Sequence, residues 1–184
     1  DLRPGDGSYL TSFVINRTGR VIASIDKTCL YPGEQLWYRA GRGQLWAELD
    51  EGIGVGVLAG FDLIRADLVH AAVQEGAQFL IAQFAADSPD YLETVRAVIH
   101  TRSLEHLVPV VAVGQLGRFF GREYLGGSAV VQPTLTAGGV PGPVECILAM
   151  GDEEDMWVVD LDLDAFREMR RRFSYDRPLR TPHR

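Results

Sequence analysis

The stretch VGVLAGFDLIRAD at residues 55–67 decides the fold expected for this chain. It belongs to an apolar, glycine-rich run at 52–62, which is typical of a central strand covered on both faces of a sheet. A helical pattern follows at 66–76 and ends at a glycine, the residue that most often terminates a helix. A strand that passes directly into a helix predicts the centre of an α/β sheet.

The next segments repeat this alternation of strand and helix. The apolar run at 77–84 predicts a second strand, and the one at 108–115 a third. Between them, Ser88 as N-cap and Pro89 as first residue predict a helix over 88–107. The β-α-β-α-β order predicts a sheet with at least one helical layer.

Shorter β segments flank this centre. Alternating runs at 8–16 and 20–26, joined by a turn, predict a hairpin that leaves Lys27 at a strand end. We take residues 1–184 as a single, partial domain with a polar tail at 174–184. Beyond the centre, the pattern predicts three short strands and a closing amphipathic helix, at 126–133, 143–150, 156–162 and 163–173.

Composition limits the function. A formal net charge of −7 disfavours binding to nucleic acid or to an anionic membrane surface, and the basic run at 170–172 suits a solvated helix end. No apolar run approaches the roughly 20 residues that span a bilayer. The two cysteines, Cys29 and Cys146, do not make a disulfide framework, so we expect a reducing, cytoplasmic compartment.

Several motifs, in this order, resemble the nitrilase, or carbon-nitrogen hydrolase, superfamily. Lys27 follows its hairpin as the family's catalytic lysine does, and Glu34 in YPGE matches the family's second glutamate. HTRSLEHLVPVVAVGQLG at 100–117 is similar to the family segment R-A-x-E-N-x-x-Y-V-V-x-x-N, with Arg102 and Glu105 on its Arg and Glu. The resemblance implies an α/β fold, a four-layer α-β-β-α sandwich of the nitrilase type that here lacks the amino-terminal part.

Position 60 departs from the family's pattern. Residues 55–67 match the nucleophile motif G-V-x-x-C-Y-D-x-x-F-P-E, with Phe61 and Asp62 on its Tyr and Asp, which the resemblance implies as substrate-binding positions. Gly60 stands where the motif has its cysteine, and thiolate attack needs a side chain that glycine lacks. The family's general-base glutamate lies upstream of the hairpin, outside these residues. We therefore expect a hydrolase-like domain that is catalytically inactive and kept for binding or assembly.

The resemblance also implies what the domain binds. The ligand would be a small amide- or nitrile-like molecule, and two chains, alike or different, would pair through the helices at 66–76 and 88–107. No metal or organic cofactor is implied. The histidines expected in helices, His70, His100 and His106, form no i, i+4 metal pair.

Other readings of the same residues stay open. The chain could belong to an active amidase or nitrilase whose remaining catalytic residues lie outside it, or to the family's acyltransferase branch. Cys29 could replace the nucleophile if the strand continues past Lys27, because the two side chains would then face the same way. An unrelated α/β binding protein would lack a pocket shared by Lys27, Glu34 and Gly60.

Overall fold

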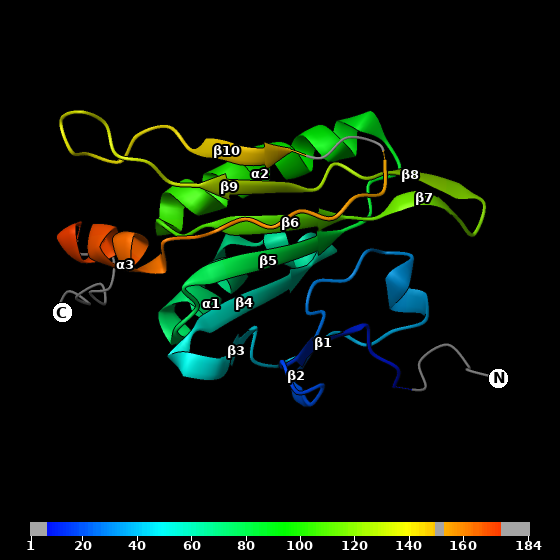
Figure 1. Ribbon diagram of the computed structural model, residues 1–184. Coiled ribbons are helices and arrows are strands. Elements are labelled where there is room, and N and C mark those ends of the chain that lie inside the picture. Colours follow the sequence, from blue (N-terminus) through cyan, green and yellow to red (C-terminus); the bar gives the residue numbers. More distant parts are fainter. Residues whose placement is uncertain (1–6, 150–152, 174–184) are drawn as a thin grey trace, which may run out of the picture.

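The computed structural model describes residues 7–149 and 153–173, so the predicted tail at 174–184 lies outside the described residues. They form one six-stranded sheet with the order β10-β9-β6-β5-β4-β3 and two separate hairpins, β1-β2 and β7-β8 (Figure 1). The strands are β1 (Thr11–Ile15), β2 (Val21–Asp26), β3 (Trp46–Glu48), β4 (Gly54–Ala59), β5 (Phe79–Phe84), β6 (Val110–Gly114), β7 (Leu116–Phe119), β8 (Arg122–Leu125), β9 (Ala129–Gln132) and β10 (Glu145–Ala149). The helices are α1 (Ala66–Glu75), α2 (Pro89–His106) and α3 (Leu163–Arg172), with short 3₁₀ turns η1 (Glu34–Leu36), η2 (Asp50–Gly52) and η3 (Gly60–Leu63).

The centre of the sheet is the predicted β-α-β-α-β unit. Strands β4, β5 and β6 run parallel and next to one another, with α1 and α2 as their connections. Antiparallel strands complete the sheet on both sides, β3 beside β4, and then β9 and β10 beyond β6. β4 is therefore a central strand, as its unbroken apolar run predicts, and five of its six residues are buried.

Both connecting helices cover the same face of the sheet. A Cβ atom built on Gly56 of β4 would lie within 3.5 Å of Ala72 in α1, and α2 packs against β6 and β9. The helix ends follow from local chemistry: the Ser88 hydroxyl accepts a hydrogen bond from the Tyr91 backbone N–H at 3.3 Å, and Pro89 occupies the first helical position. The core side chains of the two helices are Val69, Ala72, Val73, Leu92, Val95 and Ile99.

The opposite face of the sheet is covered less completely. Residues 153–162 extend along it, and β1-β2 lies at the same side, where Ser12 donates a hydrogen bond to Gln83 at 2.6 Å (Figure 1). Gln83 of β5 is exposed and Val113 of β6 keeps 48% of its surface in solvent. The apolar runs of β5 and β6 are thus enclosed on the helical face and only partly on the other.

The structure corrects the sequence prediction in two places. Residues 156–162 are extended but join no sheet, because no neighbouring strand of the described chain pairs with them. Strand β3 and the β7-β8 hairpin were not predicted. The mixed α/β architecture itself is confirmed. The described residues form a helical layer, the six-stranded sheet and, on the other side of that sheet, the β1-β2 hairpin. No helix in the described ranges has both the length and the apolar composition that a membrane crossing requires.

Candidate active site

The site lies where the loop after β2 meets the end of β4. β2 ends at Asp26, so Lys27 is the first residue beyond the strand, as predicted, and η3 begins with Gly60 directly after β4. Both residues border a cavity of about 460 Å³. Its lining also includes Tyr31, Glu34, Gln83 and Tyr91, so segments far apart in the sequence contribute to one space.

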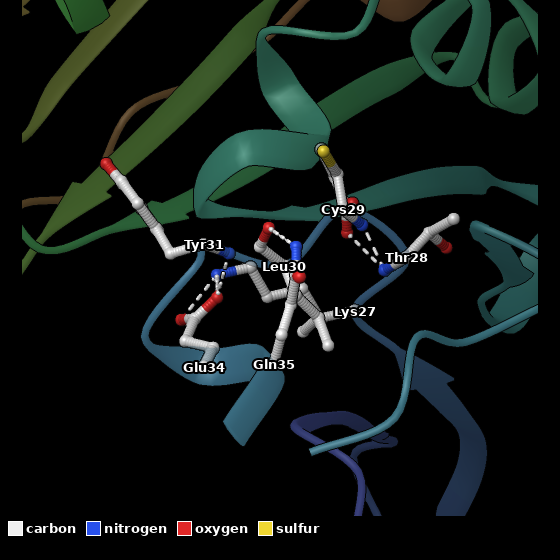
Figure 2. A network of polar contacts seen from close by, with 8 residues as sticks. Lys27, Thr28, Cys29, Leu30, Tyr31, Glu34 and Gln35 are labelled. Carbon is white, nitrogen blue, oxygen red and sulfur yellow. Dashed lines mark hydrogen bonds and ion pairs between the residues drawn. The ribbon is translucent and has the colours of Figure 1, made fainter. Parts of the chain in front are cut away.

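Lys27 and Glu34 form the central polar pair of this cavity. The Nζ atom of Lys27 lies 2.7 Å from both carboxylate oxygens of Glu34, and only 6% of the lysine side chain is exposed. Glu34 in turn accepts a hydrogen bond from the backbone N–H of Tyr31 at 2.7 Å, which fixes its carboxylate (Figure 2). A buried ammonium is retained in a low-dielectric site when it is paired and hydrogen-bonded in this way.

Gly60 presents its backbone directly to the lysine. A Cβ atom built on Gly60 would lie 3.0 Å from Nζ of Lys27 and 3.4 Å from its Cε. The φ angle of Gly60 is +55°, a left-handed conformation that costs a residue with a side chain about 1 kcal/mol or more. Glycine therefore relaxes the turn and leaves the space next to the ammonium without a side chain.

Phe61 and Asp62 lie behind the cavity and are not among its lining residues. Asp62 is 1% exposed and accepts hydrogen bonds from the backbone N–H groups of Thr28, at 3.1 Å, and Cys29. Burial raises the pKa of Asp62, while these two N–H groups and the charge of Lys27 lower it. Through these hydrogen bonds Asp62 fastens the Lys27 loop to η3, and substrate binding at Phe61 and Asp62 stays a prediction.

An aromatic cluster forms one wall of the site. The Tyr31 ring meets Phe61 edge-on with centroids 3.9 Å apart, and it lies 6.2 Å from the ring of Tyr91. Burial, followed by the nearby Tyr91 hydroxyl, raises the pKa of Tyr31, so its phenol stays protonated at neutral pH. Neither tyrosine was predicted. The position of Tyr31 in YPGE was an available signal, whereas the sequence gives none for Tyr91.

Arg102 supports η3 from the side of α2. Its Nε donates to the Leu63 carbonyl at 3.1 Å and its Nη2 to the Ile64 carbonyl at 2.6 Å. A third contact, 2.7 Å from Nη1 to Glu105, holds the guanidinium in place. The Arg and Glu matched in the sequence therefore form one clamp on the turn that presents Gly60, without reaching the cavity.

Cys29, the sequence's alternative nucleophile, lies outside the cavity that Lys27 and Gly60 border. Because β2 ends before Lys27, the condition under which both side chains would face the same way is not met. Figure 2 shows the Cys29 thiol directed away from the Lys27–Glu34 pair, and Cys29 does not line the cavity. Among the residues that the structure describes, no group of three or more His, Cys, Asp or Glu side chains could hold a metal ion.

No family model matches the chain. An (R)-stereoselective amidase from a Pseudomonas species is 28% identical over 170 residues, which are 92% of this chain and 58% of the amidase. A cysteine-to-serine variant of a Nesterenkonia amidase from the nitrilase superfamily is 25% identical, with a TM-score of 0.66 over 90% of this chain and 61% of that one.

A crystal structure of a carbon-nitrogen hydrolase from Helicobacter pylori has the same fold, with a TM-score of 0.76 at 16% identity, covering 94% of this chain and 63% of that one. This chain thus spans about three fifths of the length of these relatives. Over that partial length, the chain belongs to the nitrilase, or carbon-nitrogen hydrolase, superfamily.

Proposed function

We propose that this chain is a catalytically inactive carbon-nitrogen hydrolase-like domain that still binds a small amide- or nitrile-like ligand. The observation that carries the proposal is the position of Lys27: it is held by Glu34 and faces Gly60, a residue without a side chain. Nζ of Lys27 points at position 60, where no side chain is available to attack a carbonyl or nitrile carbon. Binding needs the cavity and its hydrogen-bond donors, whereas turnover needs the nucleophile as well.

A relative supports binding without a nucleophile. A cysteine-to-alanine variant of the Nesterenkonia amidase was solved in complex with butyramide. Other structures of that amidase carry covalent additions at its active-site cysteine. By analogy, an amide enters the cavity of the present chain with its carbonyl oxygen towards Lys27 and remains uncleaved.

The residues around the cavity have distinct roles in such a complex. Lys27 donates to the ligand's oxygen, Glu34 holds the ammonium in position, and Asp62 and Arg102 secure the two segments that meet there. The glycine leaves room for the ligand's carbonyl carbon to approach the strand end more closely than a side chain would permit.

Binding and turnover can be measured separately on the same protein. We expect butyramide to perturb NMR signals of cavity residues in the wild-type chain, with no ammonia release across a panel of amides and nitriles. Lys27→Met should weaken this binding, whereas Arg96→Met on the exposed surface of α2 should not. Absence of binding in a folded wild-type chain would refute the proposal.

The alternative is an active hydrolase whose remaining catalytic residues lie outside this chain. The Lys27–Glu34 pair supports this alternative, because Nζ of the buried lysine lies 2.7 Å from both carboxylate oxygens and borders the cavity. Ammonia release by the wild-type protein that is lost in Lys27→Met would establish the alternative and overturn the inactive assignment.

We also propose that α1 and α2 mediate pairing with a second copy. Leu104 on α2 is a large apolar side chain with 40% of its surface exposed. Light scattering on the purified chain should show a dimer that Leu104→Glu dissociates. A monomeric wild-type chain would contradict pairing through α1 and α2, but it would not bear on the proposed ligand binding.

A further inference from the structure

Lys27 has one more hydrogen-bond donor than its partners use. An ammonium group carries three N–H bonds. Two are directed to the oxygens of Glu34, and no other acceptor contacts Nζ within the described part of the chain. A side chain that is 6% exposed and ends 3.0 Å from the empty Cβ position of Gly60 therefore aims an unused donor into the cavity. A ligand oxygen at this point would satisfy it.

The charge of the cavity limits which oxygen fits. Lys27 and Glu34 are its two charged lining residues, and they neutralise each other at 2.7 Å. A carboxylate ligand on Nζ would be brought close to the Glu34 carboxylate as well, with no second cation in the lining to compensate. A neutral carbonyl accepts the same hydrogen bond without that repulsion.

The aromatic wall limits the rest of the ligand. Nζ of Lys27 lies 5.3 Å from the ring centre of Tyr31, and the rings of Tyr31 and Tyr91 both border the cavity. Their planes meet at 73°, so a flat ring entering beside them can meet one face and one edge. Aromatic contacts of this kind contribute beyond the burial of apolar area.

We propose that the cavity selects uncharged aromatic carboxamides over the corresponding carboxylates, with Glu34 as the charge filter and Tyr31 and Tyr91 as the aromatic wall. This inference rests on the proposed function, because it assumes that the cavity binds a carbonyl ligand.

Three probes of similar size test it on the wild-type chain by calorimetry at pH 7. Benzamide and benzoate differ in charge, and benzamide and cyclohexanecarboxamide differ in flatness. We expect benzamide to bind at least about tenfold more tightly than benzoate. It should bind roughly three- to tenfold more tightly than cyclohexanecarboxamide.

Variants assign each preference to its residue. Glu34→Gln leaves Lys27 as a net positive charge, so benzoate should match or overtake benzamide. Gln83→Lys adds a cation to the lining without touching the Lys27–Glu34 pair and should also favour benzoate, which decides the question if Glu34→Gln fails to fold. Tyr91→Leu should reduce the advantage of benzamide over cyclohexanecarboxamide. Glu93→Gln, at an exposed position of α2, is the matched control and should change neither ratio.

The outcomes separate this inference from the proposed function. Equal affinity for benzamide and benzoate, or a ratio that neither Glu34→Gln nor Gln83→Lys moves, would overturn the charge filter while amide binding stands. Equal affinity for the two carboxamides would overturn the aromatic wall. Absence of binding by every carboxamide would overturn the proposed function and this inference together.

Discussion

Nζ of Lys27 lies 3.0 Å from the point that a Cβ atom on Gly60 would occupy. The loop after β2 and the turn after β4 therefore place a buried cation against a position with no side chain. Asp62 and Arg102 stabilise this arrangement from behind, through hydrogen bonds to the backbone of the two segments. Position 60 therefore faces the lysine directly, and glycine offers no side-chain atom there.

Loss of Glu34 should destabilise the fold. Glu34→Ala leaves the Lys27 ammonium buried without its counter-charge, which costs about 3 kcal/mol in comparable buried pairs. Urea denaturation monitored by circular dichroism measures the change in free energy of unfolding. The control is Asp50→Ala, which removes an exposed pair with Arg17 and should cost less than about 1 kcal/mol. Equal losses in the two variants would contradict the role of Glu34 as the counter-charge of the buried Lys27 ammonium.

Removal of the Arg102 clamp should loosen η3. Arg102→Met keeps an apolar stem but loses the hydrogen bonds to the carbonyls of Leu63 and Ile64, at an expected cost of about 2 kcal/mol. Hydrogen exchange should rise in η3 more than in β4. Arg96→Met, which breaks an exposed contact with Glu93 on the same helix, is the control and should leave exchange in η3 unchanged. Unaltered exchange in Arg102→Met would exclude a clamping role.

Stability should fall on acidification because of His106. This side chain is 8% exposed, its Nε2 has no hydrogen-bond partner within the described residues, and its ring lies 5.6 Å from that of His70. Burial lowers the pKa of His106 to about 4, and the charges of Arg102 and Arg170 act in the same direction, while Glu105 opposes them. In the unfolded chain the imidazole of His106 takes up a proton near pH 6.5, whereas in the folded chain it does so only near pH 4. Between these two pH values protonation favours the unfolded chain, so the free energy of unfolding decreases as the pH falls from about 6.5 to about 4.

Melting temperatures across that pH range test the assignment. In His106→Leu the melting temperature should decrease less over this pH range, because the buried imidazole, which is protonated more readily in the unfolded chain, is absent. His100→Leu, on the same helix, should keep most of the wild-type slope. The assignment to His106 would be wrong if its replacement left the slope unchanged.

A close approach between β4 and the end of α1 should make Gly54 intolerant of any side chain. A Cβ atom there would lie 2.0 Å from the carbonyl oxygen of Gly76, so Gly54→Ala must displace backbone, at an expected cost of about 3 kcal/mol. Gly43→Ala is the matched control, because no atom lies within 4 Å of its added methyl group. Thermal unfolding should separate the two variants clearly; similar melting temperatures would contradict this packing.

The centre of the fold could be predicted because its signals are local. The run of β4 is apolar without alternation, Ser88 and Pro89 mark the start of α2, and Gly76 ends α1 at a positive φ angle. Each signal is a property of a few neighbouring residues. Strand order within the β-α-β-α-β unit then follows from connection length.

Other parts depend on contacts between distant segments. Residues 156–162 have an apolar pattern, yet strand formation requires a hydrogen-bonding neighbour, and Met156 and Val158 each remain 87% exposed. The β7-β8 hairpin was missed because its strands mix charged and apolar residues and pack little. Only the family resemblance predicted that Lys27 and Glu34 lie in one site. Tyr91 could not be predicted, because it reaches the site through the packing of α2 against the rest of the fold.

The most direct test of the account is the rate at which a thiol introduced by Gly60→Cys reacts with acrylamide, followed by intact mass in a background of Cys29→Ser and Cys146→Ser. Lys27 should lower the pKa of that thiol, so labelling at pH 7 should be about tenfold faster than in the same protein carrying Lys27→Met. We predict this lysine-dependent labelling at position 60. Equal rates with and without Lys27, in folded proteins, would contradict the claim that the lysine faces the place of a missing nucleophile.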